Sequence, residues 1–145
     1  MRLKIKAKLH QILDEKMRHF ENMIDDVRAS NNETKSSMGD KYETSREMLQ
    51  QEIMRLQQQL ANVQQQKAVL DQMRDTPRKN IGFGSVVKTS VGNFVVAISI
   101  GRFKVSKEEY IGISEQTPLA KQLVGKNKED KFIFQQKEAK ILQVE

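Results

Sequence analysis

Two long stretches of helical periodicity, separated by a polar segment, constrain the fold of this chain more than any other feature. In each stretch apolar residues recur every three or four positions, the spacing of one apolar face on an α-helix. Residues 29–37, which lie between the stretches, contain nothing apolar larger than alanine. Each apolar stripe needs a partner that covers it, and the nearest candidate is the other helix. The stripe residues are Leu9, Ile12, Leu13, Met17, Phe20, Met23, Ile24 and Val27, then Leu49, Ile53, Leu56, Leu60, Val63, Leu70 and Met73.

We therefore expect an antiparallel coiled-coil hairpin. One helix runs from about Leu3 to Arg28 and the other from about Asp40 to Asp75, with an acidic tip near residues 29–43. Two helices joined at one end bury a single narrow seam. Such a hairpin is a poor place for an enzymatic pocket, but it is thin and stiff enough to enter a channel.

Composition divides the chain into two parts. Residues 1–75 contain one Gly and no Pro, whereas residues 76–145 contain the other six Gly, both Pro and most of the β-branched residues. We predict a hairpin over 1–75, a linker over 76–80 and a small domain over 81–145. The fold class is then α+β, with an antiparallel sheet and one short helix in the second domain.

The charge and the absence of cysteine narrow the function classes. The first part has 13 Lys and Arg against 12 Asp and Glu, and the second has 12 against 7. The net charge of +6 favours partners with acidic surfaces, nucleic acid among them. The lack of Cys excludes disulfides, zinc–thiolate sites and a Cys nucleophile.

The sequence also predicts a cytoplasmic protein without a membrane partner. No run approaches the roughly 20 apolar residues that span a bilayer. The basic start, residues 1–9, lacks the apolar core of a signal peptide, and we interpret it as the solvated beginning of the first helix.

The second part shows strand and turn signals around one helix signal. Thr117 is a cap, Pro118 suits the first helical position, and Gly125 follows the helix end. Both histidines lie in the hairpin, so a Ser/His/Asp site is excluded here, and we expect a binding module with no small-molecule substrate. The expected strands are 83–89, 93–100, 110–114, 131–135 and 139–144. The expected core residues are Phe83, Phe94, Ile98, Ile111, Leu119, Leu123, Phe132, Phe134 and Leu142.

Asp40 and Glu43, at the start of the second helix, allow two interpretations. An acid followed three residues later by Glu is a capping-box pattern, and Gly39 before it suits a turn. Alternatively, two carboxylates about one turn apart can contribute to a Mg²⁺ site whose remaining ligands come from another molecule. The two roles are compatible.

Over nearly its whole length the chain resembles the GreA/GreB family of bacterial transcript cleavage factors. Residues 81–87, Ile-Gly-Phe-Gly-Ser-Val-Val, are similar to the entry into the family's FKBP-like domain. Residues 113–126 are similar to its Ile-Ser to Gly-Lys segment, and residues 130–144 to its closing strand pair. Residues 39–43 match its Gly-Asp-x-x-Glu tip.

This resemblance implies a transcription elongation factor that binds RNA polymerase. The domain over 81–145 would dock near the rim of the secondary channel, and the hairpin would reach toward the active site. Asp40 and Glu43 would hold a Mg²⁺ shared with the polymerase, which then hydrolyses the 3′ end of backtracked nascent RNA. No activity is expected of the protein alone.

Other functions remain open on the same residues. After Glu43 the chain reads Thr44-Ser45-Arg46-Glu47, which departs from the family's usual run. A Gre-like regulator or inhibitor of the polymerase without cleavage activity is therefore the main alternative. An FKBP-like prolyl isomerase or chaperone with a coiled-coil handle is a further one, and an unrelated coiled-coil adaptor is the last.

Overall fold

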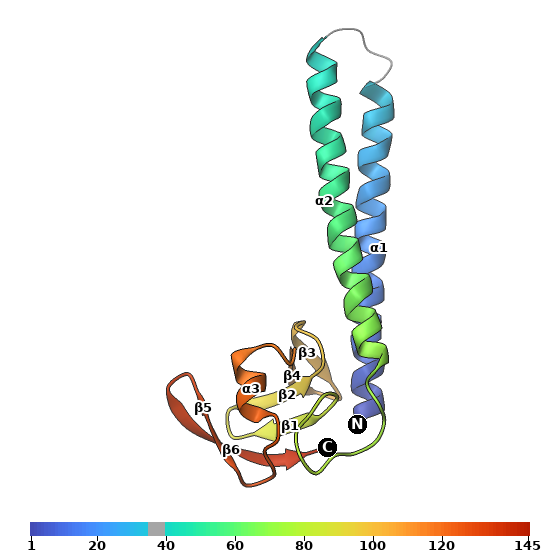
Figure 1. Ribbon diagram of the computed structural model, residues 1–145. Helices are drawn as coiled ribbons and strands as arrows, with labels where there is room; N and C mark the ends of the chain where they lie inside the picture. Colours follow the sequence, from blue (N-terminus) through green and yellow to red (C-terminus); the bar gives the residue numbers. More distant parts are fainter. Residues whose placement is uncertain (35–39) are drawn as a thin grey trace. The chain divides into compact units, whose positions relative to one another are not determined.

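The computed structural model describes residues 1–34 and 40–145, and the side chains of residues 1–30 and 45–145. It contains two long helices followed by a small β domain with one short helix, as the α+β class predicts (Figure 1). The chain divides into two compact units, one of residues 10–67 and one of residues 1–9 with 68–145. None of the helices in the described part is long and apolar enough to cross a membrane.

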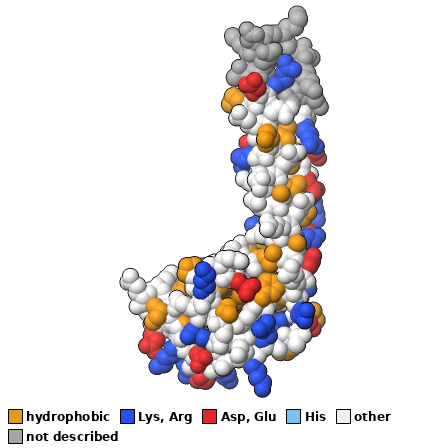
Figure 2. Space-filling view, viewed as in Figure 1, with side chains coloured by type: hydrophobic (Ala, Val, Ile, Leu, Met, Phe, Trp, Pro, Cys, Tyr) orange, Lys and Arg blue, Asp and Glu red, His pale blue; other side chains and the backbone are white. Residues whose placement is uncertain are grey.

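The long helices α1 (Arg2–Thr34) and α2 (Asp40–Asp71) pair in antiparallel directions (Figure 1). Their predicted apolar stripes form the seam, which confirms the hairpin. Within residues 10–67 the seam contains Leu13, which is fully buried, and a cluster of Ile24, Ile53 and Leu56. On the visible face of the helices, charged side chains of both signs are interspersed with apolar ones (Figure 2).

Both helices end elsewhere than predicted. Helix α1 continues past Arg28 to Thr34, because residues 29–34 contain neither Gly nor Pro to stop it. Helix α2 ends at Asp71, ahead of the expected Asp75. Its ladder closes with tight bonds of the 3₁₀ type, one of which runs from the Met73 N–H to the Leu70 carbonyl over 2.9 Å.

The first residues of α1 are solvated only in part, which corrects the interpretation from the basic composition: Leu3 and Lys4 are exposed, but the side of the helix that carries Ile5 is not. Ile5 and Leu9 are fully buried, and the Arg2 side chain is only 5% exposed. The apolar stripe therefore begins at Ile5, and the lysines between its members lie on the polar side of the helix.

Arg2 and Lys6 form hydrogen bonds with the backbone just after the end of α2. Arg2 Nη2 donates to the Arg74 carbonyl, and Lys6 Nζ donates to the Met73 carbonyl over 2.7 Å. Carbonyls beyond a helix end lack intrahelical partners, and cations there complement the helix dipole. Burial lowers the pKa of Arg2, and the charge of Asp75 acts in the opposite direction.

The second unit is built on a six-stranded sheet in the order β3-β4-β2-β1-β6-β5. Every neighbouring pair is antiparallel except β2 and β4, which run parallel. Helix α3 buries Ala120 and Leu123 in the core beside the sheet (Figure 1). The strands are β1 (Val86–Thr89), β2 (Gly92–Val96), β3 (Gly101–Val105), β4 (Glu108–Ile113), β5 (Lys131–Phe134) and β6 (Lys137–Val144), and the helix is α3 (Pro118–Leu123).

Strand β3 was not predicted. Its hairpin with β4 turns at Ser106 and Lys107, whose φ angles are +52° and +70°. Two consecutive positive φ values are typical of a type I′ turn, which Asn and Gly favour. Neither residue type occurs at this turn, so the sequence carried no signal for it.

Most predicted core residues of the domain are buried or pack on the core, but the prediction that Leu142 lies in the core is wrong. Its side chain is 47% exposed, whereas Ala139 and Ile141 are buried. Side chains alternate along a strand, so Leu142 must point to the opposite face. Tyr110, which was not predicted, is fully buried, and its hydroxyl donates to Glu108 over 2.9 Å.

Candidate functional site

The two predicted site residues lie in the first turn of α2. The first helical residue of α2 is Asp40. A capping box with Asp40 as its cap would start the helix one residue later, at Lys41. The side chains of Asp40 and Glu43 are outside the described residues, so their roles as caps or metal ligands stay predictions. The next turn is described from Ser45 onward, and there the Glu47 side chain is exposed.

In the part of the hairpin whose side chains are described, the buried cluster nearest to these acids lies two to three turns beyond them. At about 1.5 Å per residue, about 15 Å of helix separates Glu43 from Ile53. Ile53 and Leu56 pack with Ile24 of α1, and Phe20, Met23, Val27 and Leu60 close the cluster from its sides. This cluster is the described contact nearest to the tip that holds α1 and α2 together.

An ion pair marks the register of the helices further from the tip. Lys67 Nζ lies 2.9 Å from Asp14 Oδ1, and this hydrogen bond lowers the pKa of Asp14. Both side chains are more than a third exposed, so the pair contributes little to stability. The same antiparallel alignment places Lys67 opposite Asp14 and Leu56 opposite Ile24. In this alignment α2 runs from its start at Asp40 back toward the N-terminal part of α1.

The described residues contain no group of three or more His, Cys, Asp or Glu side chains that could hold a metal ion. The centroids of the His19 and Phe20 rings lie 5.8 Å apart. The side chains of Asp40 and Glu43 lie outside the described residues, so the shared metal site stays a prediction.

The two segments of the β domain that carry the family resemblance are joined by hydrogen bonds. The Ile81 N–H donates to the Lys126 carbonyl over 2.9 Å, and the Gly125 N–H donates to the Ile81 carbonyl over 2.8 Å. Gly125 has a φ of +88°, which glycine adopts without strain. Residues 81–87 and 113–126 thus form one local substructure, a relation that their distance in sequence does not reveal.

The predicted helix cap in this substructure is confirmed. Thr117 Oγ1 accepts a hydrogen bond from the Ala120 N–H over 3.2 Å and donates one to the Ser114 carbonyl over 2.8 Å. Pro118 occupies the first turn, where its missing N–H costs nothing.

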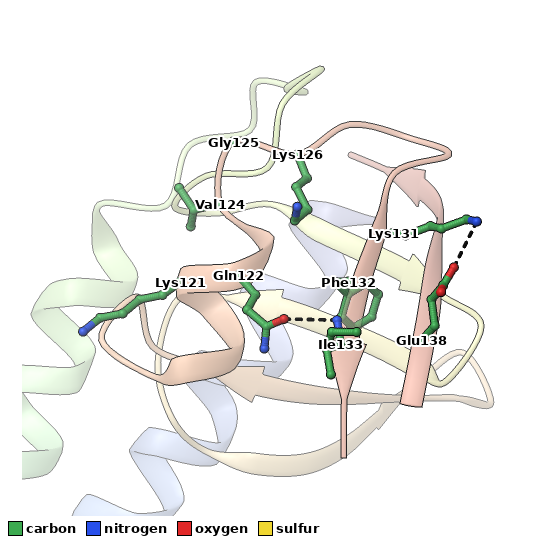
Figure 3. A pocket seen from close by; sticks show the side chains of 9 residues that line it. All are labelled: Lys121, Gln122, Val124, Gly125, Lys126, Lys131, Phe132, Ile133 and Glu138. Carbon is green, nitrogen blue, oxygen red and sulfur yellow. Dashed lines mark hydrogen bonds and ion pairs between the residues drawn. The ribbon is translucent and has the colours of Figure 1, made fainter. Parts of the chain in front are cut away.

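A hollow beside α3 and β5 was not predicted from the sequence. It has a volume of about 840 Å³. Its lining includes Lys121, Lys126, Lys131 and Ile133 (Figure 3). The sequence signal that could have found it is the spacing of these lysines around a short strand, but that pattern is also typical of an ordinary solvated surface.

Comparisons with known proteins give one distant similarity. No protein-family model matches the chain, and no curated protein matches it. Among solved structures, the crystal structure of Thermus aquaticus Gfh1 is similar at 18% sequence identity, over 93% of this chain and 92% of that chain, with a TM-score of 0.35.

Proposed function

We propose that this protein is a bacterial transcription elongation factor of the Gre type that acts on RNA polymerase in the cytoplasm. The β domain docks on the polymerase and the helical hairpin enters the secondary channel. Asp40 and Glu43 then complete a Mg²⁺ site together with the polymerase. The consequence is hydrolysis of backtracked RNA near its 3′ end, a reaction that the polymerase performs and this chain stimulates.

One observation supports this proposal most. A Gly-Asp-x-x-Glu motif stands where the second helix of an antiparallel hairpin begins, in a chain whose β domain joins residues 81–87 to residues 113–126. The resemblance named these segments separately, and all of them belong to the same two-part fold.

The donor set fits a shared Mg²⁺ better than a complete site. Mg²⁺ prefers six oxygen ligands and commonly takes one or two carboxylates, with water and phosphate oxygens as the rest. When bound, the ion would supply Lewis-acid chemistry for water attack on a phosphodiester. The contribution of this chain is to present two carboxylates at the start of a continuous helix.

Amide substitutions separate the metal role from the capping role. Asn caps helices about as well as Asp, and Gln replaces Glu in a capping box. Asp40→Asn and Glu43→Gln should therefore preserve the start of α2 and remove the charge that a metal needs. Glu47→Gln, one turn further along the same helix, is the matched control.

The experiment adds each protein to backtracked elongation complexes and measures both RNA cleavage and polymerase binding. We expect the wild-type protein and Glu47→Gln to stimulate cleavage, and the two tip variants to bind equally well but not to stimulate. Undiminished cleavage with both tip variants would remove the metal role.

A second candidate function is a Gre-like regulator that occupies the channel without stimulating cleavage. The observation that favours it is Thr44-Ser45-Arg46-Glu47, which differs from the run usual in the family. This candidate predicts that the wild-type protein binds the polymerase, leaves cleavage unchanged and slows elongation. The sign of the effect on elongation therefore distinguishes the two functions.

A further inference from the structure

Strand β5 is an edge strand whose outer side is bonded by a side chain instead of by another strand. It pairs with β6 alone and ends the six-strand order. Its Ile133 N–H donates over 3.0 Å to Oε1 of Gln122, which reaches across from α3 (Figure 3). Gln122 thus occupies a position that a neighbouring strand would otherwise take.

The direction of this bond identifies the other edge groups. In an antiparallel strand the N–H and C=O of one residue point to the same side, and the side alternates along the chain. The Ile133 carbonyl and both backbone groups of Lys131 therefore also point away from β6. Together they form a short row of donors and acceptors that matches an extended peptide.

The same edge carries exposed apolar surface. Ile133 is 53% exposed, whereas the neighbouring Phe132 is 3% exposed and belongs to the core. Ile133 lines the hollow of about 840 Å³ beside α3. Binding clefts commonly fall between about 300 and 1,000 Å³, so a short segment fits this space.

Charge selects the kind of segment. Lys121 and Lys126 line the hollow and make no ion pair within the described part of the chain, and Lys131 is paired with Glu138 at 3.0 Å. Lysines on an edge strand oppose pairing with a second copy of the same strand. They favour a segment that carries carboxylates.

We propose that the free edge of β5 binds an extended, acidic peptide segment of another protein by strand addition. The segment displaces the Gln122 side chain, pairs with the backbone of Lys131 and Ile133, and places an apolar residue against Ile133. Lys126 contacts one of its carboxylates, and Lys121, whose side chain points away from β5 (Figure 3), adds positive charge beside the hollow. This proposal does not depend on transcript cleavage, and it holds for any protein partner with such a segment.

The test uses the full chain and a short blocked peptide of alternating glutamate and valine. Amide chemical shifts are followed by NMR during the titration. We expect the largest changes at Lys131 and Ile133 and slowed hydrogen exchange at Ile133. The same peptide with lysine in place of glutamate, or with methylated backbone nitrogens, should not bind.

Three variants sharpen the test. Ile133→Pro removes the outward N–H at an edge position where proline is tolerated, and it should abolish binding. Ile133→Asp, which keeps the strand backbone, should do the same by repelling the peptide. Gln122→Ala removes the competing side chain and should strengthen binding several-fold, an effect that a merely structural Gln122 would not produce.

Charge reversal supplies the matched comparison. Lys121→Glu with Lys126→Glu should weaken binding by about tenfold. Lys104→Glu, on the opposite edge strand β3, should leave it unchanged. Three results would each overturn the proposal: largest shift changes outside β5 and residues 121–126, equal binding of the lysine peptide, or binding of a single-stranded oligonucleotide at these residues in place of the peptide.

Discussion

Leu56→Ala tests whether the seam between α1 and α2 holds the hairpin together. Leu56 is fully buried and contacts both its own helix and α1 through Ile24. The substitution removes most of a buried side chain from the cluster nearest to the start of α2. It therefore weakens the part of the fold on which presentation of Asp40 and Glu43 depends.

The expected cost follows from the surroundings of the side chain. Buried Leu→Ala changes cost about 2–5 kcal/mol, and the cost rises with the cavity that remains. The flanking Phe20, Met23 and Leu60 are only partly buried, so they can move into the space. We therefore expect a loss of about 2–3 kcal/mol in the free energy of unfolding, near the lower end of that range.

Met54→Ala is the matched control on the same helix. Met54 is 68% exposed, so its truncation should change stability by less than about 0.5 kcal/mol. Urea unfolding followed by far-UV circular dichroism reports the helices, and amide hydrogen exchange locates the loss. The larger change should fall on amides of residues 10–67.

Equal stability of Leu56→Ala and Met54→Ala would refute the packing described for this seam. If Leu56→Ala increased the rate of amide exchange more in the β domain than in residues 10–67, that would likewise contradict it. The difference in exposure between these side chains is large enough that experimental error cannot hide the expected contrast.

Three further outcomes follow from the β domain. Burial raises the pKa of Tyr110 to about 12, so stability that is full below pH 10 should fall as pH rises toward 12; an ultraviolet titration of the phenol checks this. Thr117→Ala removes the acceptor for the Ala120 N–H and should cost about 1 kcal/mol in thermal unfolding. Gly84→Ala should destabilise more than Gly101→Ala in denaturant unfolding, because both have positive φ but only at Gly84 would an added Cβ meet neighbours, at 3.3 Å.

Each of these outcomes has its own contradiction. An ordinary titration of Tyr110 near pH 10 would show that the phenol is accessible in the folded protein. Unchanged stability of Thr117→Ala would mean that the cap does not hold α3. Equal losses of stability at Gly84 and Gly101 would show that the close contacts of an added Cβ at Gly84 do not destabilise the folded protein.

The hairpin was predictable because its signal is long and periodic. The apolar stripes extend over many turns, and Leu13, Ile24, Ile53 and Leu56 are buried as their spacing requires. The ends of the helices were less predictable. The bonds from Arg2 and Lys6 to the chain after α2 join residues more than sixty positions apart, and no local pattern records them.

The sheet was only partly predictable because its turns use unusual residues. Gln135 and Gln136 have φ values of +51° and +67° and connect β5 to β6 as a two-residue turn. A connection of three residues, 136–138, was expected there, and Leu142 was expected in the core of the strand that follows it. The edge position of β5 depends on the order of the strands in the sheet, for which the sequence contains no local pattern.

The candidate site was predicted from a short motif, and its structural context was predicted better than its chemistry. The start of α2 at Asp40 lies one residue ahead of the start that the capping pattern predicts. A capping box and a carboxylate pair for metal need the same residue types at the same spacing. The response to magnesium separates the two roles, because only the metal role depends on the ion.

The most direct measurement of the central claim is the Mg²⁺ concentration that gives half-maximal RNA cleavage in backtracked complexes. If Asp40 and Glu43 hold the shared ion, Asp40→Asn and Glu43→Gln should raise that concentration by about tenfold or more, because a neutral amide oxygen binds Mg²⁺ more weakly than a carboxylate does. Glu47→Gln should leave it unchanged. A half-maximal Mg²⁺ concentration that is the same for all four proteins would contradict the account.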